Sequence, residues 1–414
     1  MMRILLDGGI TSPRGFRAAG VRCGIKKSGR KDLTMIVSSR PAAAAGAFTT
    51  NLVKAAPVVL TEGLVDAGKR LRAVVVNSGN ANAMTGERGM ADARIMAQAA
   101  AATLHVPKGS VAVASTGVIG RYLPMRRVLR GIRKAARALA PGRKAAVGAA
   151  EAIMTTDTFR KEVAVTTILS DGTQITIGGM AKGSGMIAPR MRVNHATMLC
   201  FVTTDAAVSQ EALERAFSAA TDRSFNMVSV DGDQSTNDTA LVLANGAAGN
   251  APFGHDPAFD EALEHVCTAL AKMIARDGEG ATKLVEVVVT GAASERDGRN
   301  AAISVVSSNL VKAALFGCDP NFGRIAAALG TAGCALEPGK LDVGLASDRG
   351  SAKIIENGLP AGMSDPESLQ RARMILHAHE LNITIDLGLG SHSARAWGCD
   401  LTYDYVKINA EYTT

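Results

Sequence analysis

The segment GSGMIA at residues 183–188 is the first whose glycine spacing suggests a binding site, in this case for a dinucleotide. It follows a strand-like stretch and fits the loose form of a dinucleotide-binding loop, and Asp205 lies about as far along the chain as that motif's acidic residue. Such a loop must open a helix whose N-terminus holds the pyrophosphate. Pro189 follows directly, and another strand-like stretch begins near residue 196, which leaves no room for a helix. The sequence therefore argues against a dinucleotide site.

His377, His379 and Glu380 form a second candidate, this time for a metal. The flanking RARMIL at 371–376 favours a helix, on which residues two apart point to different faces and would not share an ion. No Cys-x-x-Cys pair occurs among the six cysteines, which are Cys23, Cys200, Cys267, Cys318, Cys334 and Cys399. The sequence therefore predicts no metal site and no disulfide scaffold, and it favours reduced thiols in the cytoplasm.

The run at residues 121–144 is a third candidate, because it holds nine Lys or Arg and no acidic residue. Leu129, Ile132 and Ala136 recur in it at helical spacing. A basic helix could bind nucleic acid, but no known binding motif accompanies the charge. A solvated amphipathic helix is the preferred interpretation, and a non-enzymatic nucleic-acid binder stays open as a remote alternative.

The whole chain of 414 residues is 47% hydrophobic and 20% charged, which is typical of a globular protein with a sizeable core. Strand-like and helix-like segments alternate, so the sequence predicts the α/β class. No stretch approaches the ~18 apolar residues of a membrane span, and the first apolar run is too short for a signal peptide. We therefore expect a cytoplasmic protein without a membrane segment.

Local patterns predict the elements that must position any site. Turn residues Asp171 and Gly172 predict a hairpin between two of the strands. Strands are expected at 72–76, 162–169, 174–177, 196–204, 284–290 and 401–408, and helices at 91–104 and 259–274. The last of these strands leads into Asn409. We expect a smaller C-terminal α/β unit to begin near residue 283.

Eight segments in order resemble one known family. They are VVVNSGNAN (74–82), ASTGVIG (114–120), IMTTDT (153–158), AKGSGMIAPRMRVNHATMLCFVTTDA (181–206), SVDGDQSTNDT (229–239), DGEGATK (277–283), GCDPNFGRI (317–325) and YVKINAEYTT (405–414). The chain resembles the ornithine acetyltransferase, or glutamate N-acetyltransferase, family of arginine biosynthesis. This implies an α/β mixed-sheet sandwich of the ornithine acetyltransferase type, self-cleaved into two intertwined chains.

The resemblance implies that the chain cuts itself between Ala196 and Thr197. The Thr197 hydroxyl would attack the Ala196 carbonyl, shift the acyl group from nitrogen to oxygen, and leave an ester for water to cleave. The freed α-amine would then serve as the base for that hydroxyl. Its ordinary pKa lies just above neutrality, so a useful fraction is neutral near pH 7.

The same motifs imply the other site residues. Thr116 and Gly117 match the family's oxyanion hole, whose donors typically contribute roughly 3–4 kcal/mol each. Substrate-binding positions carry over to Thr155, Lys182, Thr197, Glu279, Asn409 and Thr414. An amino-acid substrate offers a carboxylate to Lys182, and its cationic amines can meet Glu279.

The implied reaction moves acetyl from N2-acetylornithine to glutamate, without a metal or nucleotide cofactor. Acetyl-CoA stays open as a further acetyl donor. Residues 1–196 would form an α chain and residues 197–414 a β chain, in which 197–283 completes the catalytic core and 284–414 forms the C-terminal unit with a tail that returns to the active site. The two chains would stay associated and pair into a dimer of αβ units.

One departure from the family concerns the cleavage segment. Six residues stand between Pro189 and Ala196, whereas the family usually has two. The additional four could form a bulge before the scissile bond. A related self-cleaving aminopeptidase or amidase, which passes the acyl group to water, and a paralogue of a specialised pathway are the alternatives that stay open.

Overall fold

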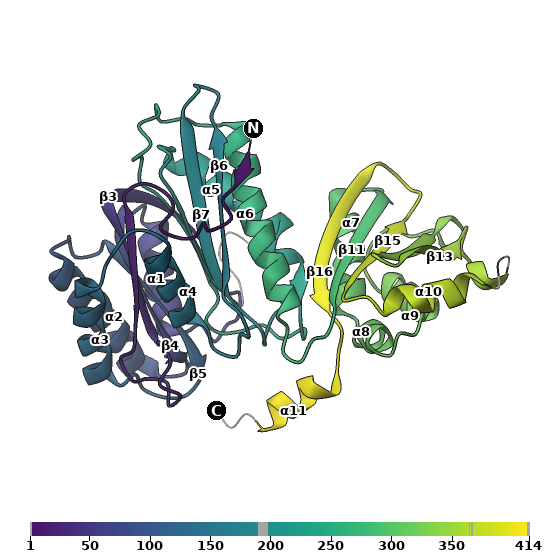
Figure 1. Ribbon diagram of the computed structural model, residues 1–414, viewed down its shortest axis with the longest axis horizontal. Helices are drawn as coiled ribbons and strands as arrows, with labels where there is room; N and C mark the ends of the chain where they lie inside the picture. The colour runs from purple at the N-terminus through teal and green to yellow at the C-terminus, as the bar shows by residue number, and fades with distance from the viewer. Residues whose placement is uncertain (1, 189–197, 364, 366, 412–414) are drawn as a thin grey trace.

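The computed structural model describes residues 2–188, 198–363, 365 and 367–411. Figure 1 shows two lobes, each built on a β-sheet with helices against it. Both sheets mix parallel and antiparallel neighbours, which confirms the α/β class that the sequence predicts. In these ranges, no helix combines the length and the apolar character that crossing a bilayer requires.

The sheet of the first lobe has nine strands within the described residues. In spatial order they are β1 (Arg3–Ile4), β6 (Lys161–Ile168), β7 (Gln174–Lys182), β8 (Leu199–Thr204), β10 (Thr239–Ala244), β3 (Leu33–Phe48), β4 (Leu71–Asn80) and β5 (Val111–Val118), and β2 (Phe16–Val21) pairs beside them with β3. The β6–β7 pair is antiparallel around the Asp171–Gly172 turn, so the predicted hairpin is confirmed.

The α-helices that accompany this sheet are α1 (Ala56–Asp66), α2 (Gly86–Leu104), α3 (Met125–Arg137), α4 (Arg143–Ile153), α5 (Gln210–Arg223) and α6 (Pro257–Arg276). Alternate residues of β8 face opposite sides. Cys200 and Val202 belong to the core that contains α6, whereas Phe201 belongs to the core that contains α4. The central strands are therefore buried on both faces.

Helix α6 joins the lobes. Its predicted apolar face is buried and packs on β6 and β7, and the helix also contacts β11 and β16 of the second lobe (Figure 1). Its N-terminus is capped by Asp256, whose carboxylate accepts the amides of Ala258 and Phe259. The helix ends at Arg276, one residue before Asp277, so α6 delivers the 277–283 motif to the junction between the lobes.

The second sheet has seven strands within the described residues. They are, in order, β14 (Leu359–Pro360), β13 (Gly350–Glu356), β12 (Asp342–Ser347), β15 (Glu380–Asp386), β11 (Leu284–Ala292), β16 (His392–Cys399) and β9 (Val228–Ser229). The helical segments that go with it are η1 (Phe225–Met227), α7 (Glu295–Ser307), α8 (Asn309–Phe316), α9 (Phe322–Gly330), η2 (Pro338–Lys340), η3 (Ala361–Met363) and α10 (Ser368–Leu376). Except for β9, the strands of this sheet follow residue 283.

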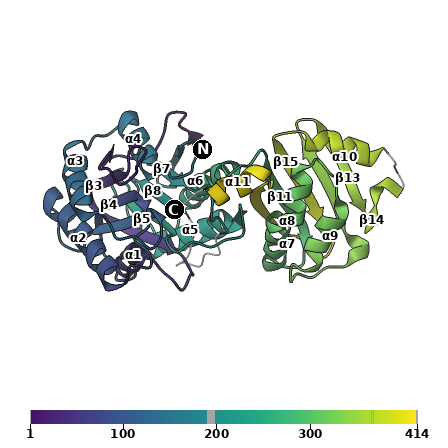
Figure 2. The same ribbon diagram turned by 90° about the horizontal axis from the view of Figure 1, so that it is seen from below.

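The C-terminal segment contradicts the predicted strand at 401–408. Residues Tyr403–Glu411 form a helix, α11, which leaves the second lobe and runs back beneath the first (Figures 1 and 2). None of its residues is buried, so no core contact enforces an apolar face. The alternation of Leu401, Tyr403 and Tyr405 therefore carries no information about burial, and it does not mark a strand.

The basic run forms helix α3, as predicted. Val128, Ile132 and Ala135 are buried on its inner face. Arg127, Arg130 and Lys134 donate to the backbone carbonyls of Gly24, Cys23 and Arg22 respectively. Part of the positive charge thus serves to hold residues 22–24 against the helix, which favours the structural interpretation over a nucleic-acid surface.

Candidate active site

A small cavity of about 190 Å³ brings together most of the expected site residues. It lies at the end of strands β5 and β7, next to the start of β8. Its walls are formed by Thr116, Gly117, Ile119, Thr155, Thr156, Lys182, Gly185, Met186, Met198, Leu199, Ser235, Asn237, Asp238, Glu279 and Asn409. The described part of the chain therefore contributes seven separate segments to one cavity.

A larger hollow of about 750 Å³ lies along α4, β6 and α6, but its charged groups already have partners. Arg143 and Arg160 both pair with Glu162, and Lys272 pairs with Glu286. Paired surface charges contribute little on their own and have no need of a ligand. The small cavity is the better candidate because its wall holds a buried lysine, Lys182, for which the described residues include no carboxylate within salt-bridge distance.

Thr116 and Gly117 lie at the end of β5, where the chain runs beside β4. Gly117 has a φ of +128°, and a Cβ built on it would lie 2.5 Å from the carbonyl carbon of Gly79. No larger residue fits there, so glycine is required for this close approach of two strands. Thr116 is 9% exposed and faces the cavity, which suits a hydroxyl that stabilises an oxyanion.

Lys182 is the last residue of β7 and is 8% exposed. Among the described residues, no carboxylate lies within 4.0 Å of its ammonium group. Burial lowers the pKa of Lys182, and nearby Lys161 adds to the effect, whereas Asp157, Glu279 and Asp238 oppose it. A buried cation without a contact ion is costly, so this position favours the arrival of an anion.

Glu279 supplies the opposite charge. Its carboxylate lies directly over Gly185, because a Cβ built on that glycine would come 2.3 Å from Oε2. Its amide donates to the carbonyl of Ser184 at 2.9 Å, and Asn409 Nδ2 donates to its Oε2 at 3.0 Å. The cavity thus presents an ammonium and a carboxylate to the same small space.

Helix α11 is anchored beside Glu279. Thr402 Oγ1 donates to the carbonyl of Gly280 at 2.7 Å, and Asp400 Oδ1 accepts the amides of Thr282 and Lys283. Asn409 therefore reaches the cavity on a helix, whereas the sequence predicted that a strand would lead to it. Thr414, the other C-terminal residue expected at the site, lies outside the described residues.

The expected nucleophile and cleavage pair, Thr197 and Ala196, also lie outside the described residues, as do residues 190–195 of the departure noted above. Met198, the covalent neighbour of Thr197, lines the cavity, and its carbonyl accepts the amide of Thr239 at 2.8 Å. Leu199 then pairs in register with Lys182 across β7 and β8. The chain immediately after Thr197 is thereby fixed beside Lys182.

One stretch of the wall that had no expected role contributes three polar residues, Ser235, Asn237 and Asp238. Asn237 is 5% exposed, and its amide nitrogen donates to the carbonyls of Ala81 at 2.6 Å and Ser115 at 2.9 Å. It therefore holds the 235–238 loop against the chain just before Thr116. Their signal in the sequence was the polar run STND, which lies inside one of the family-like segments.

The structure also describes most of the two segments that the sequence argued against as a dinucleotide loop and a metal site. Two residues after Gly185, Ile187 forms an isolated antiparallel bridge with Gln234, and residues 186–188 are not helical. His377 follows the end of α10, and His379 Nδ1 lies 3.2 Å from the carbonyl of Thr282. In the part of the chain that the structure describes, no group of three His, Cys, Asp or Glu is placed to hold a metal ion.

Comparisons with known proteins give a consistent result. A family model described as the ArgJ family matches residues 17–414. The "Arginine biosynthesis bifunctional protein ArgJ" of Symbiobacterium thermophilum is 55% identical over 415 residues, covering 99% of both chains. The "Glutamate N-acetyltransferase" of Methanocaldococcus jannaschii is 46% identical over 413 residues, covering 100% of both. A crystal structure of an ornithine acetyltransferase complexed with ornithine, from Mycobacterium tuberculosis, is 47% identical and covers 46% of this chain and 100% of its own, with a TM-score of 0.44.

Proposed function

The chain belongs to the ArgJ family, and from that premise we propose that it transfers the acetyl group of N2-acetylornithine to glutamate through an ester on Thr197. It is a glutamate N-acetyltransferase of arginine biosynthesis. The observation that supports the substrate class is the charge pattern of the cavity, where buried Lys182, with no carboxylate of the described residues in contact, faces Glu279. An amino acid carries the complementary carboxylate and ammonium groups.

The reaction follows from the groups around the cavity. The free α-amine of Thr197 takes the proton of its own hydroxyl, and the hydroxyl oxygen attacks the acetyl carbonyl of N2-acetylornithine. In this proposal the Thr116 hydroxyl and the Gly117 amide donate to the oxyanion that forms. The C–N bond then breaks, ornithine leaves with the proton, and acetyl stays as an ester on Thr197.

The second half runs the same path in reverse with glutamate. Its neutral α-amine attacks the ester carbonyl, the same donors bind the oxyanion, and Thr197 leaves as the alcohol with N-acetylglutamate as product. Both substrates share the α-carboxylate, which Lys182 would hold, and they differ at the side chain. The chain itself supplies nucleophile, base and oxyanion donors, so the proposed reaction requires no cofactor. Acetyl-CoA is a further donor that the assay below can include.

The sheet supports the proposal that the two fragments stay together after cleavage. Strands β8 and β10 of 197–414 lie between β7 and β3 of 1–196, and hydrogen bonds join them on both sides. Separation of the fragments would break two ladders inside a buried sheet. We place this αβ unit in a dimer and in the cytoplasm, where the six free cysteines would persist as thiols.

The test measures ornithine release and N-acetylglutamate formation from N2-acetylornithine, with and without glutamate. A transferase releases ornithine in proportion to N-acetylglutamate and depends on glutamate. An equal rate without glutamate, with free acetate as product, would indicate a hydrolase of the aminopeptidase or amidase type and refute the proposal. Thr197→Ala is the matched negative control, since it removes one hydroxyl and one methyl group.

A further inference from the structure

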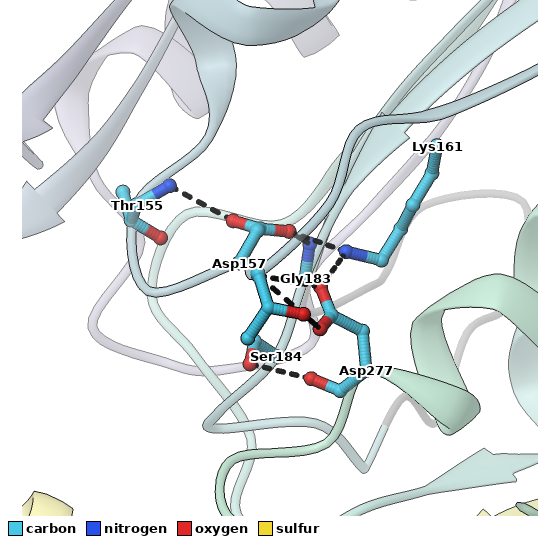
Figure 3. Close-up of polar contacts among 7 residues, drawn as sticks. Thr155, Asp157, Lys161, Gly183, Ser184 and Asp277 are labelled. Atoms are coloured by element: carbon cyan, nitrogen blue, oxygen red, sulfur yellow. Dashed lines mark hydrogen bonds and ion pairs between the residues drawn. The ribbon is translucent and has the colours of Figure 1, made fainter. Parts of the chain in front are cut away.

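A buried ion cluster lies directly behind the cavity. Lys161 Nζ contacts Asp157 Oδ1 at 2.7 Å and Asp277 Oδ2 at 2.5 Å, and the side chains of the three residues are between 0% and 2% exposed (Figure 3). None of the three lines the cavity. Buried ion pairs often contribute little net stability compared with apolar residues of the same size. Their place behind the cavity therefore calls for another explanation.

The cluster connects three loops that carry site residues. Asp157 Oδ2 accepts the amide of Thr155 at 2.8 Å, and its Oδ1 accepts the amide of Gly183 at 2.8 Å, next to Lys182 (Figure 3). Asp277 accepts from the amide and hydroxyl of Thr158. The carboxylates of Asp157 and Asp277 thus fix the 155–158 loop and the end of β7.

Asp277 also fixes the third loop. Its backbone carbonyl accepts the Ser184 hydroxyl at 2.6 Å, and two residues later the amide of Glu279 donates to the Ser184 carbonyl. The distance between Lys182 and Glu279 is therefore set through Ser184 and Asp277. Asp157 and Lys161 precede the proposed cleavage point and Asp277 follows it, so the cluster also joins the two fragments at the site.

The charges of the cluster do not cancel. Two carboxylates and one ammonium leave an excess of one negative charge, which faces the buried Lys182. The other charged groups that act on Lys182 are Glu279 and Asp238, which favour its cation, and Lys161, which disfavours it; Lys182 in turn acts on Lys26. Burial would raise the pKa of Asp157, but Lys182 and Lys161 outweigh it and hold that pKa well below its usual range.

We propose that Asp157, Lys161 and Asp277 are positioning residues of the substrate cavity, which fix Lys182 opposite Glu279 and supply the negative charge that offsets Lys182. This inference rests on the proposed function, because it assigns Lys182 to the substrate carboxylate. The cluster acts through Lys182 and Glu279 and touches no substrate itself. It therefore governs how tightly substrate binds and over which pH range.

Asp157→Asn tests the proposal most directly. An amide accepts on one side only, so its NH2 would face either the Thr155 or the Gly183 amide and leave a donor unpaired. It also removes the carboxylate that raises the pKa of Lys182, so that pKa falls further. Lys182 must be protonated to hold a carboxylate; the alkaline limb of kcat/KM therefore moves to lower pH. We expect kcat/KM at neutral pH to fall about 10- to 100-fold.

Asp205→Asn is the matched control. Asp205 is 1% exposed, and its two oxygens also accept one backbone amide each, from Thr176 at 2.7 Å and Arg14 at 3.0 Å. Thr176 lies on the same strand as Lys182 but about 20 Å away at ~3.3 Å per residue. This variant loses the same charge and the same kind of acceptor as Asp157→Asn. Because the loss lies far from Lys182, we expect kcat/KM within about twofold of wild type and an alkaline limb at the wild-type pH.

The experiment compares pH profiles of kcat/KM for N2-acetylornithine, after intact mass has shown the fraction of cleaved chain. The inference is overturned if the alkaline limb of Asp157→Asn stays at the wild-type pH, or if the kcat/KM of Asp157→Asn is no lower than that of Asp205→Asn.

If Asp157→Asn does not fold or mature, Ser184→Ala is the variant that tests the inference, because it removes only the hydroxyl that donates to the Asp277 carbonyl. Its KM should rise about fivefold; an unchanged KM overturns the inference. An inactive wild type would refute the proposed function as well, whereas an active wild type with indifferent variants refutes this inference alone.

Discussion

Gly185→Ala should displace Glu279 without altering any charge. The backbone at Gly185 does not adopt a positive φ, so alanine is acceptable there on conformational grounds. Its Cβ would, however, lie 2.3 Å from Glu279 Oε2 and 2.4 Å from Cδ. Since non-bonded carbon and oxygen atoms settle near 3.5 Å, the carboxylate must move by about 1 Å. That movement also breaks the 3.0 Å hydrogen bond from Asn409.

The expected effect is large because the site is small. A misplacement of about 1 Å can cost about 100-fold in rate, which is about 2.7 kcal/mol at 1.36 kcal/mol per factor of ten. We expect kcat/KM for N2-acetylornithine to fall by that order, while the thermal midpoint changes little. Initial rates would be measured on cleaved protein, with Gly254→Ala as the matched control, because a Cβ at Gly254 meets nothing within 4 Å.

Equal kcat/KM in Gly185→Ala and Gly254→Ala would refute the reasoning. It would mean either that Glu279 does not contact the substrate or that its position does not matter. A lowered thermal midpoint with normal kinetics would lead to the same conclusion. Glu279→Gln, measured alongside, shows the effect of removing the charge while the side chain keeps its size.

Three further predictions concern other parts of the cavity. Thr116→Ala should lower kcat about 10²- to 10³-fold while Thr116→Ser keeps much more, and wild-type turnover in Thr116→Ala would show that another group stabilises the oxyanion. Deleting residues 410–414 removes the last two residues of α11, directly after Asn409, which bonds to Glu279. KM should rise sharply while self-cleavage persists, and unchanged kinetic constants would count against a role for this tail. Because burial lowers the pKa of Lys182, its charge is lost at a lower pH than that of an ordinary lysine, so KM should rise on the alkaline side; a KM that stays flat up to the ordinary lysine range would contradict this.

Patterns with an unambiguous period predicted their elements well. Helix α6 carries Phe259, Leu263 and Val266 at helical spacing, and all three are buried, as the sequence predicts. The β6–β7 hairpin follows from alternation on both sides of a turn sequence. The error at α11 has the opposite cause. Hydrophobic periodicity reports a buried face, and this helix has none within the described residues, so its period could not be read.

The cavity was predictable only in part. The family-like segments identified Lys182 and Glu279, but the sequence could not show that no carboxylate among residues 2–188 and 198–411, as far as they are described, contacts the Lys182 ammonium. The Lys161–Asp277 contact spans 116 positions, and nothing in either local sequence indicates the other. A buried pair between distant segments arises from the tertiary fold, so the structure alone reveals the cluster behind the cavity.

The central claim is that Thr197 becomes a chain terminus and then carries acetyl. Denaturing mass spectrometry of the purified protein, before and after incubation with N2-acetylornithine alone, tests both parts. We expect two species, residues 1–196 and 197–414, of which the second begins Thr-Met-Leu-Cys and gains the mass of one acetyl group. A protein that stays whole and is fully active, or a cleaved one that turns over without ever gaining acetyl, would contradict the account.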